Sequence, residues 1–151
     1  MFPYQINEGV LQIPIAWQDQ SLNIFRIPAC GNAKEASLLI SRDASQGDQR
    51  FDEFISSQIK QCEQQLPGFK LLQHQLCVEP FSYAWVDYTW LAQDKTVMLR
   101  QIFFESKPAN IIVTLTTTPE DAPAHEAAWR EMVRGVQLKN LVVAGNITRM
   151  F

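Results

Sequence analysis

Four strand-like runs follow one another from residue 70 onward and are separated by short connections. Each run is rich in β-branched or aromatic residues, which are enriched in strands. The runs cover residues 70–79, 83–93, 96–106 and 109–117. Connections this short join antiparallel neighbours, because parallel strands need a crossover of about a dozen residues or more. The sequence therefore predicts an antiparallel meander at the centre of the fold.

Three more strand signals precede this meander, at residues 6–13, 21–27 and 36–42. Alternation along the second signal puts Leu22 and Ile24 on one face. Alternation along the third puts Leu38 and Ile40 on the face opposite to Leu39. These strands offer apolar side chains on both faces, and a second apolar face normally needs another layer, a dimer or a ligand. Two helices, one on each face, would also meet that need.

Helical spacing marks two further segments. The first helix is expected to follow capping residues at 45–48 and to end at Leu66, before Pro67. The second is expected to start with Thr118 as N-cap and Pro119 as first helical residue. The apolar stripes consist of Phe51, Phe54, Ile55, Ile59, Cys62 and Leu66 in the first helix and of Trp129, Met132, Val133 and Val136 in the second.

Length and composition place these elements in one domain. The chain has 151 residues, of which 46% are hydrophobic, as in a globular domain. The tail after residue 138 is expected to add a short strand or to pack along an edge. Together the patterns predict an α+β fold in which an antiparallel sheet is flanked by two helices, within a single domain of residues 1–151.

Charge and targeting signals limit the partners. The net charge is −3 and no run of Lys or Arg occurs, which argues against nucleic acid and against an anionic membrane surface as partners. The N-terminus lacks a signal-peptide pattern and no window approaches 18 apolar residues, which favours the cytoplasm. The cysteines Cys30, Cys62 and Cys77 are expected to be reduced and mostly buried.

Catalytic chemistry has little support in the sequence. His74 and His125 lie on apolar patterns without a second ligand at zinc spacing, so we expect packed or half-exposed histidines, no metal and no cofactor. Asp87 lies within an aromatic strand, where a general acid in an apolar pocket is conceivable. Exposure to solvent, or burial with hydroxyl partners, explains it more simply. We therefore expect that the protein is not an enzyme; Asp87 and His74 are the candidates if it is a hydrolase.

Two glutamines lie on apolar faces. Gln58 is on the stripe of the first helix, and Gln101 shares a strand face with Leu99 and Phe103. An amide in such a place must find hydrogen-bond partners or remain near water. Two interpretations stay open. Each glutamine is satisfied within the protein, or both line a groove and offer hydrogen bonds to a partner.

Short motifs give the chain a family resemblance. It opens with M-x-x-Y-x-I-N-E-G at residues 1–9, followed by L-x-I-P at 11–14, W-Q-D-x-S-x-N at 17–23 and L-P-G-F at 66–69. With the order of strands and helices, these motifs resemble the Eag chaperones of type VI secretion systems, within the DcrB-like family. The resemblance covers essentially the whole chain.

The resemblance implies a fold and a function. The fold would be a curved antiparallel sheet with two flanking helices, similar to Mog1 and PsbP. The protein would be a cytoplasmic homodimer that carries out no chemistry. It would bind and shield N-terminal transmembrane helices of a type VI secretion effector before the effector is loaded onto the secretion spike.

On this basis we expect an apolar groove with a few polar contacts, lined by Leu22, Ile24, Leu38, Leu39, Ile40, Gln58 and Gln101. Alternation does not decide whether Leu39 or its two neighbours point into the groove, and Ile102 has the same ambiguity with Gln101. A small-ligand or lipid-binding module that uses the same groove is the alternative.

Overall fold

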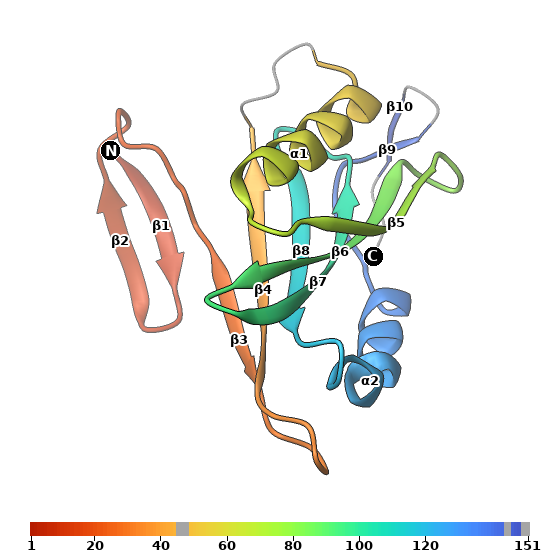
Figure 1. Ribbon diagram of the computed structural model, residues 1–151. Coiled ribbons are helices and arrows are strands. Elements are labelled where there is room, and N and C mark those ends of the chain that lie inside the picture. The colour runs from red at the N-terminus through yellow and green to blue at the C-terminus, as the bar shows by residue number, and fades with distance from the viewer. Residues whose placement is uncertain (45–48, 144–145, 149–151) are drawn as a thin grey trace.

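A six-stranded antiparallel sheet forms the centre of the protein, with the strand order β3-β4-β8-β7-β6-β5 (Figure 1). The computed structural model describes residues 1–44, 49–143 and 146–148. The strands of this sheet are β3 (Asn23–Ile27), β4 (Ala36–Asp43), β5 (Lys70–Cys77), β6 (Tyr83–Ala92), β7 (Lys95–Phe104) and β8 (Asn110–Thr117). With its two helices, the protein has the α+β architecture that the sequence predicts.

The predicted meander is confirmed by the pairing of β5 to β8, each antiparallel to the next. Gln93 and Asp94 form the β6–β7 turn with φ values of 52° and 68°, the left-handed backbone that a tight hairpin favours. Strand β4 pairs with β8 rather than with β5. The helix between β4 and β5 carries the chain across the sheet to its far edge.

Helix α1 (Phe51–Gln65) covers one face of the sheet over β6, β7 and β8. The buried core beneath it consists of Phe51, Phe54, Ile55, Ala84, Val86, Tyr88, Phe103 and Ile112. The ring of Phe54 lies edge-on to that of Phe103, with 6.1 Å between centroids. The helix ends at the predicted place, where the N–H of Leu66 donates to the carbonyl of Cys62 and Pro67 follows. We call this side of the sheet the α1 face.

Helix α2 (Ala122–Arg134) covers the opposite side, which we call the α2 face. The core there consists of Ala36, Ile102, Phe104, Val113, Leu115, Trp129 and Leu141, with Ile27, Leu38 and Ile40 packed against it. Each helix therefore has a core of its own, and the sheet separates the two cores. One helix therefore packs on each face of the sheet, an arrangement that the sequence allowed but did not establish.

The short strand predicted within residues 6–13 is confirmed, but the strand that pairs with it was not predicted. This segment contributes to a two-stranded hairpin of β1 (Phe2–Ile6) and β2 (Gly9–Ile13), paired with each other and not with the central sheet. Gly9 adopts a φ of 156°, a backbone conformation that side chains disfavour, directly after the Asn7–Glu8 turn. The turn marks the start of β2 and joins it to β1.

Both helix starts differ in detail from the prediction. The capping residues expected at 45–48 lie outside the described residues, and Arg50, which precedes α1, makes no capping hydrogen bond through its side chain. Helix α2 begins at Ala122, three residues later than predicted. Thr118 nevertheless accepts a hydrogen bond from the N–H of Asp121 at 3.2 Å, so it caps the turn that leads into the helix.

The end of the chain forms a short hairpin of β9 (Leu141–Val143) and β10 (Asn146–Thr148), where one strand or edge packing was expected. Leu141 is fully buried in the α2-face core, and it bridges to Ser106 after β7. The predicted strand character of the tail is thus confirmed for these residues. Among the described helices, neither has both the length and the apolar character needed to cross a membrane.

Candidate functional site

A row of four side chains crosses four adjacent strands on the α1 face. Cross-strand pairing places Ile24 of β3 opposite Leu39 of β4, Leu39 opposite Thr114 of β8, and Thr114 opposite Gln101 of β7. Side chains paired in this way lie on the same face of a sheet. The register therefore brings together three of the residues that the sequence suggested for the groove, although they lie far apart along the chain.

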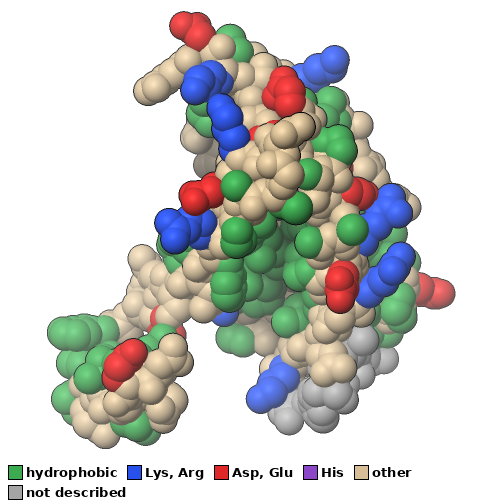
Figure 2. Space-filling model, turned by 90° about the horizontal axis from the view of Figure 1, so that it is seen from below, with side chains coloured by type: hydrophobic (Ala, Val, Ile, Leu, Met, Phe, Trp, Pro, Cys, Tyr) green, Lys and Arg blue, Asp and Glu red, His purple; other side chains and the backbone are tan. Residues whose placement is uncertain are grey.

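Helix α1 leaves the outer end of this row uncovered. The core under α1 contains side chains of β6, β7 and β8 but none of β3 or β4. Ile24 is 70% exposed, and Leu22, two residues earlier in the chain, is 56% exposed. A cleft of about 490 Å³ lies beside the row, lined in part by Ile24, Val97 and Thr116. Figure 2 shows hydrophobic side chains gathered in a hollow of the surface, with charged side chains around it.

Leu38 and Ile40 lie on the other side of the sheet. Both pack against the α2-face core, next to buried Val113 and Leu115. Ile102 is also part of that core and is only 1% exposed. The structure thus places Leu39 and Gln101 on the α1 face. Leu38, Ile40 and Ile102 lie on the α2 face. Strand register decides a question that the alternation left open.

The two glutamines lie at the same level of the α1 face. Phe54 of α1 packs on Phe103 of β7, and the chain just past α1 accepts a hydrogen bond from Leu91 beside the β6–β7 turn. The helix therefore runs from Phe103 toward that turn. Gln58 lies one helical turn beyond Phe54, and Gln101 lies two strand residues from Phe103 in the same direction. Both steps span roughly 6 Å, so the two glutamines lie at the same level.

Their hydrogen bonding differs. The Nε2 of Gln101 donates to the Oγ1 of Thr114 at 3.1 Å, so this amide has a partner inside the protein. The side chain of Gln58 is half-buried, and no hydrogen bond joins it to another described residue. Thr114 is a buried member of the row that sequence reasoning missed. The alternation of β8, combined with the β7 register, is the signal that would have found it.

A second polar cluster lies between the sheet and α2. Arg100 of β7 lies 3.5 Å from the carboxylate of Asp87 and also pairs with Glu126 of α2. Its guanidinium carbon lies 5.4 Å from the centroid of the Trp129 ring. Glu126 in turn pairs with Arg130 one helical turn later. These contacts link charged residues of the sheet to α2.

Asp87 is therefore buried against a cation rather than against hydroxyls, which corrects the expectation from the sequence. Burial raises the pKa of the Asp87 carboxyl above its ordinary value, and the charge of Arg100 opposes that rise. For Glu126, partial burial acts to raise the pKa, but the hydrogen bond from Arg130 and the charge of Arg100 outweigh it and lower the pKa. The geometry is that of an ion-pair network that holds α2 on the sheet.

The remaining candidates lie apart from the row. His125 is buried, in line with the prediction, but His74 is exposed on the edge strand β5, contrary to the expectation of a packed or half-exposed side chain. The expectation of mostly buried cysteines is also wrong, since Cys30 is exposed and Cys62 and Cys77 are half-buried. All three are free thiols. Within the described residues, no three His, Cys, Asp or Glu side chains are grouped to hold a metal ion.

The chain matches known proteins over most of its length. Residues 8–135 match the model of the DcrB family. The chain is 48% identical over 132 residues to a Pseudomonas aeruginosa protein named Effector EagT6, which covers 87% of this chain and 92% of the relative.

Two solved structures are similar to different degrees. A crystal structure of a P. aeruginosa protein of unknown function, PA94, described as a putative regulator, aligns with a TM-score of 0.81 and 47% identity over 90% of this chain and 95% of that one. LpqN of Mycobacterium tuberculosis, involved in cell envelope biogenesis, aligns at a TM-score of 0.40 and 12% identity over 90% of this chain and 88% of that one, too weakly to support an argument. By the family match and by its identity to EagT6, the chain belongs to the DcrB family.

Proposed function

We propose that this protein is a chaperone that binds apolar N-terminal transmembrane segments of a type VI secretion effector and shields them from water before the effector is loaded onto the secretion spike. The observation that carries this proposal is the uncovered part of the α1 face. There, exposed Ile24 and half-buried Leu39 lie in one cross-strand row with Thr114 and Gln101. The name of the relative, Effector EagT6, favours an effector-associated role.

The physical reason is that a transmembrane helix in water exposes a large apolar surface. Each Å² of apolar surface removed from water stabilises a complex by about 25 cal/mol. The side chains of Leu22, Ile24 and Leu39 offer a matching apolar surface on one face of the sheet. The half-buried amide of Gln101 lies in the same row as Ile24 and Leu39, and Gln58 is half-buried on α1. Both amides can replace hydrogen bonds that transmembrane helices make with each other in a bilayer.

Several finer features belong to the same proposal. The chaperone acts as a homodimer in the cytoplasm, and its sheet is curved as in Mog1 and PsbP. It binds its partner without catalysis, a view supported by the placement of Asp87 against Arg100 under α2 rather than in an open cleft. Its resemblance to the Eag chaperones motivates each of these features.

The test is co-expression of the full chain with an effector that carries N-terminal transmembrane segments. We expect the effector to accumulate and to co-purify with the chain, and to be lost when the chain is absent. An effector that lacks those segments is the control, and its level should not depend on the chain. Equal accumulation and secretion of the complete effector with and without the chain would refute the proposal.

A second candidate is a small-ligand or lipid-binding module, favoured by the cleft of about 490 Å³, a volume within the usual range for small-molecule sites. The high exposure of Ile24 argues for a larger, extended partner, because a small ligand there would remain half in water. Native mass spectrometry of the purified protein separates the two. A bound small molecule of constant mass favours the ligand-binding module, and an unliganded protein favours the chaperone.

A further inference from the structure

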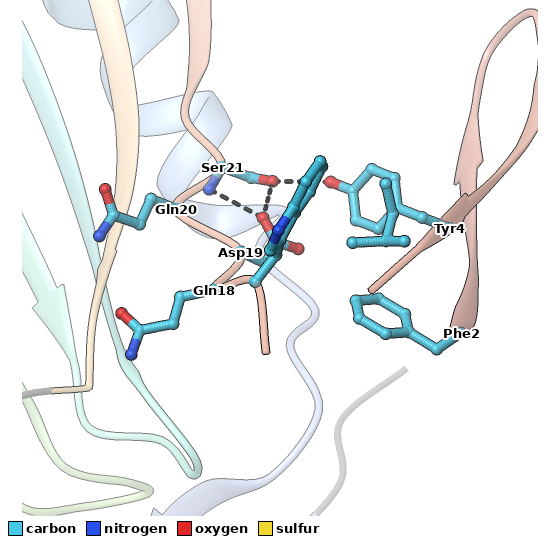
Figure 3. A pocket seen from close by; sticks show the side chains of 8 residues that line it. Phe2, Tyr4, Gln18, Asp19, Gln20 and Ser21 are labelled. Carbon is cyan, nitrogen blue, oxygen red and sulfur yellow. Dashed lines mark hydrogen bonds between the residues drawn. The ribbon is translucent and has the colours of Figure 1, made fainter. Parts of the chain in front are cut away.

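A cavity lies between the β1–β2 hairpin and the linker that leads from it to β3. Its volume is about 370 Å³. The hairpin contributes Phe2, Tyr4 and Ile13 to its lining, and linker residues 17–21 contribute the rest. Figure 3 shows Phe2 and Tyr4 projecting from the hairpin toward the linker, where Asp19 and Ser21 lie. The volume is within the usual range for small-molecule sites, so the cavity can admit a long side chain of a partner.

Three aromatic rings border this cavity without a ring partner of their own. Within the described residues, Phe2, Tyr4 and Trp17 make no stacking or edge contact with another ring. Trp17 is 64% exposed, and its backbone N–H donates to the carbonyl of Pro14 at 3.0 Å, so a turn fixes its position. The face of an aromatic ring carries negative partial charge and attracts cations. Open rings around a cavity therefore favour a cationic ligand.

Asp19 is the sole charged residue in the lining of the cavity. Its Oδ1 accepts hydrogen bonds from the backbone N–H of Ser21, at 2.9 Å, and from the Ser21 hydroxyl (Figure 3). The hydrogen bond from that hydroxyl, above all, holds the pKa of the Asp19 carboxyl below its ordinary value, so the group is charged at neutral pH. The other oxygen, Oδ2, accepts no hydrogen bond from a described residue.

Arg42 of β4 is the basic residue whose charge reaches Asp19. Its Nη1 donates instead to the side chain of Asn23 at 2.6 Å and to the carbonyl of Ser21 at 3.3 Å. Among the described residues, no ion pair joins Asp19 to Arg42 or to another basic side chain. The cavity thus combines open aromatic faces with a carboxylate that has no direct counter-ion.

The cavity lies at the end of the α1 face where a bound helix would overhang. The row from Ile24 to Gln101 crosses three strand spacings, roughly 14 Å, whereas a transmembrane helix of about 20 residues is about 30 Å long. Helix α1 covers the sheet at the β7 end of the row, so the excess length extends past β3, where the hairpin lies (Figure 1). Asp19 is five residues before Ile24, at most about 18 Å along the chain.

We infer that this cavity binds a basic side chain, preferably the guanidinium of an arginine, at the end of the transmembrane segment that the α1 face shields. The choice of partner rests on the proposed function. Lys and Arg are common beside transmembrane helices. A planar guanidinium stacks on aromatic rings while its N–H groups donate to a carboxylate, here the open Oδ2 of Asp19. A quaternary ammonium group has no N–H and would leave that oxygen without a donor.

The first experiment tests the cavity in the purified full chain without an effector. Ethylguanidinium is titrated against isotope-labelled protein, and ethylurea, a neutral molecule of similar shape, is the control. Nuclear magnetic resonance follows the indole N–H signals, and Trp17→Phe assigns that of Trp17 by its loss. We expect ethylguanidinium to shift this signal selectively and Asp19→Asn to weaken its binding by about threefold or more. No selective shift, or an equal response to ethylurea, would overturn the site.

The second experiment tests the partner. A soluble carrier protein is fused to a segment of about 20 Leu and Ala residues, flanked at both ends by Arg in one fusion and by Gln in the other. We expect the wild type to bind the Arg fusion roughly fivefold more tightly, from one cation–π contact and one exposed ion pair. Asp19→Asn should remove this preference. Glu8→Gln is the matched control, because it removes a charge from the hairpin turn outside the cavity, and it should keep the preference.

The readouts separate this inference from the proposed function. If Ile24→Asp abolishes binding of both fusions while the wild type binds the two equally, the groove stands and the basic-residue site is wrong. If the preference for Arg and the ethylguanidinium shift both depend on Asp19 but Ile24→Asp binds normally, the site stands and the groove is wrong. Failure of the wild type to bind either fusion would overturn both.

Discussion

The two faces of the central sheet receive the same kind of side chain but are covered differently. On β4, Leu38 and Ile40 pack into the core under α2, whereas Leu39 between them points to the α1 face and belongs to neither core. Helix α1 covers β6, β7 and β8, and its cover stops before β3 and β4. The comparison shows that α1 leaves Ile24 and Leu39 outside its core, at one end of the sheet.

The faces also differ in their polar groups. Under α2, Arg100 pairs with Asp87 and Glu126, so charged side chains join the helix to the sheet. On the α1 face, the row beside the helix holds the neutral pair Gln101 and Thr114. Neutral hydrogen-bonding groups next to exposed apolar side chains suit a partner that brings few charges. An ion-pair network suits a permanent contact within the protein, such as that between α2 and the sheet.

The largest effect on effector binding should come from a charge placed on the uncovered part of the α1 face. Ile24→Asp, and likewise Leu22→Asp, should weaken effector binding by more than about 3 kcal/mol, because an unpaired carboxylate would be buried under the partner. Leu76→Asp is the control, since Leu76 is 42% exposed on β5, the strand at the other edge of the sheet. Binding is measured by co-purification and by titration. Normal binding by both α1-face variants would place the groove elsewhere.

Substitutions on the α2 face should instead change the stability of the fold. Arg100→Met removes the cation that faces buried Asp87, and breaking such a pair should lower the free energy of unfolding by about 3 kcal/mol. Urea unfolding of the full chain measures the change. Arg130→Met, in which an exposed partner of Glu126 is lost, should cost less than about 1 kcal/mol and serves as the control. Equal losses would argue against a network centred on Arg100.

A smaller effect is expected for Gln101→Leu. The change removes the hydrogen bond to Thr114 and one amide beside the groove, so binding of the effector should weaken by about 1 kcal/mol, roughly fivefold in Kd. Unfolding by urea should report a loss of similar size at most. Gln58→Leu, which breaks no hydrogen bond to a described residue, should affect binding without reducing stability. A gain in binding for both variants would mean that the partner makes no polar contact here.

The smallest expected effect is a difference in pH dependence. The folded-state pKa of Asp87 is raised above the ordinary 3.8, so its contribution is fully present below that value and is lost as the pH rises through the folded pKa. Asn cannot ionise and resembles the protonated carboxyl. The stability of the wild type relative to Asp87→Asn should therefore fall as the pH increases from below 3.8. The opposite slope would mean that the charge of Arg100 outweighs burial.

Local patterns predicted most of the secondary structure. The four runs from residue 70 became β5 to β8, because short connections and tight turns leave antiparallel pairing as the accessible arrangement. The apolar stripe of α1 and its end at Leu66 followed from helical spacing and Pro67. At the N-terminus, the short strand predicted within residues 6–13 corresponds to β2, but β1 and the turn that joins the two strands were missed.

The site was only partly predictable. Ile24, Leu39 and Gln101 were named from alternation and resemblance, and register brings them into one row. Leu38 and Ile40 were named with them because alternation shows only that neighbours face opposite ways. Which way is inward depends on where each helix lies. The exposure of His74 likewise depends on its place at the sheet edge, which no local pattern reports.

The sequence by itself determined the type of most elements, the antiparallel meander, the low charge and the motifs that lead to the DcrB family, since each depends on residues close together in the chain. The tertiary structure decided the pairing of β4 with β8, the difference in helix cover between the two faces of the sheet, and the separation of the β1–β2 hairpin from that sheet. These features arise from contacts between residues far apart in sequence. Their free energy depends on which surfaces meet, and local periodicity carries no information about that choice.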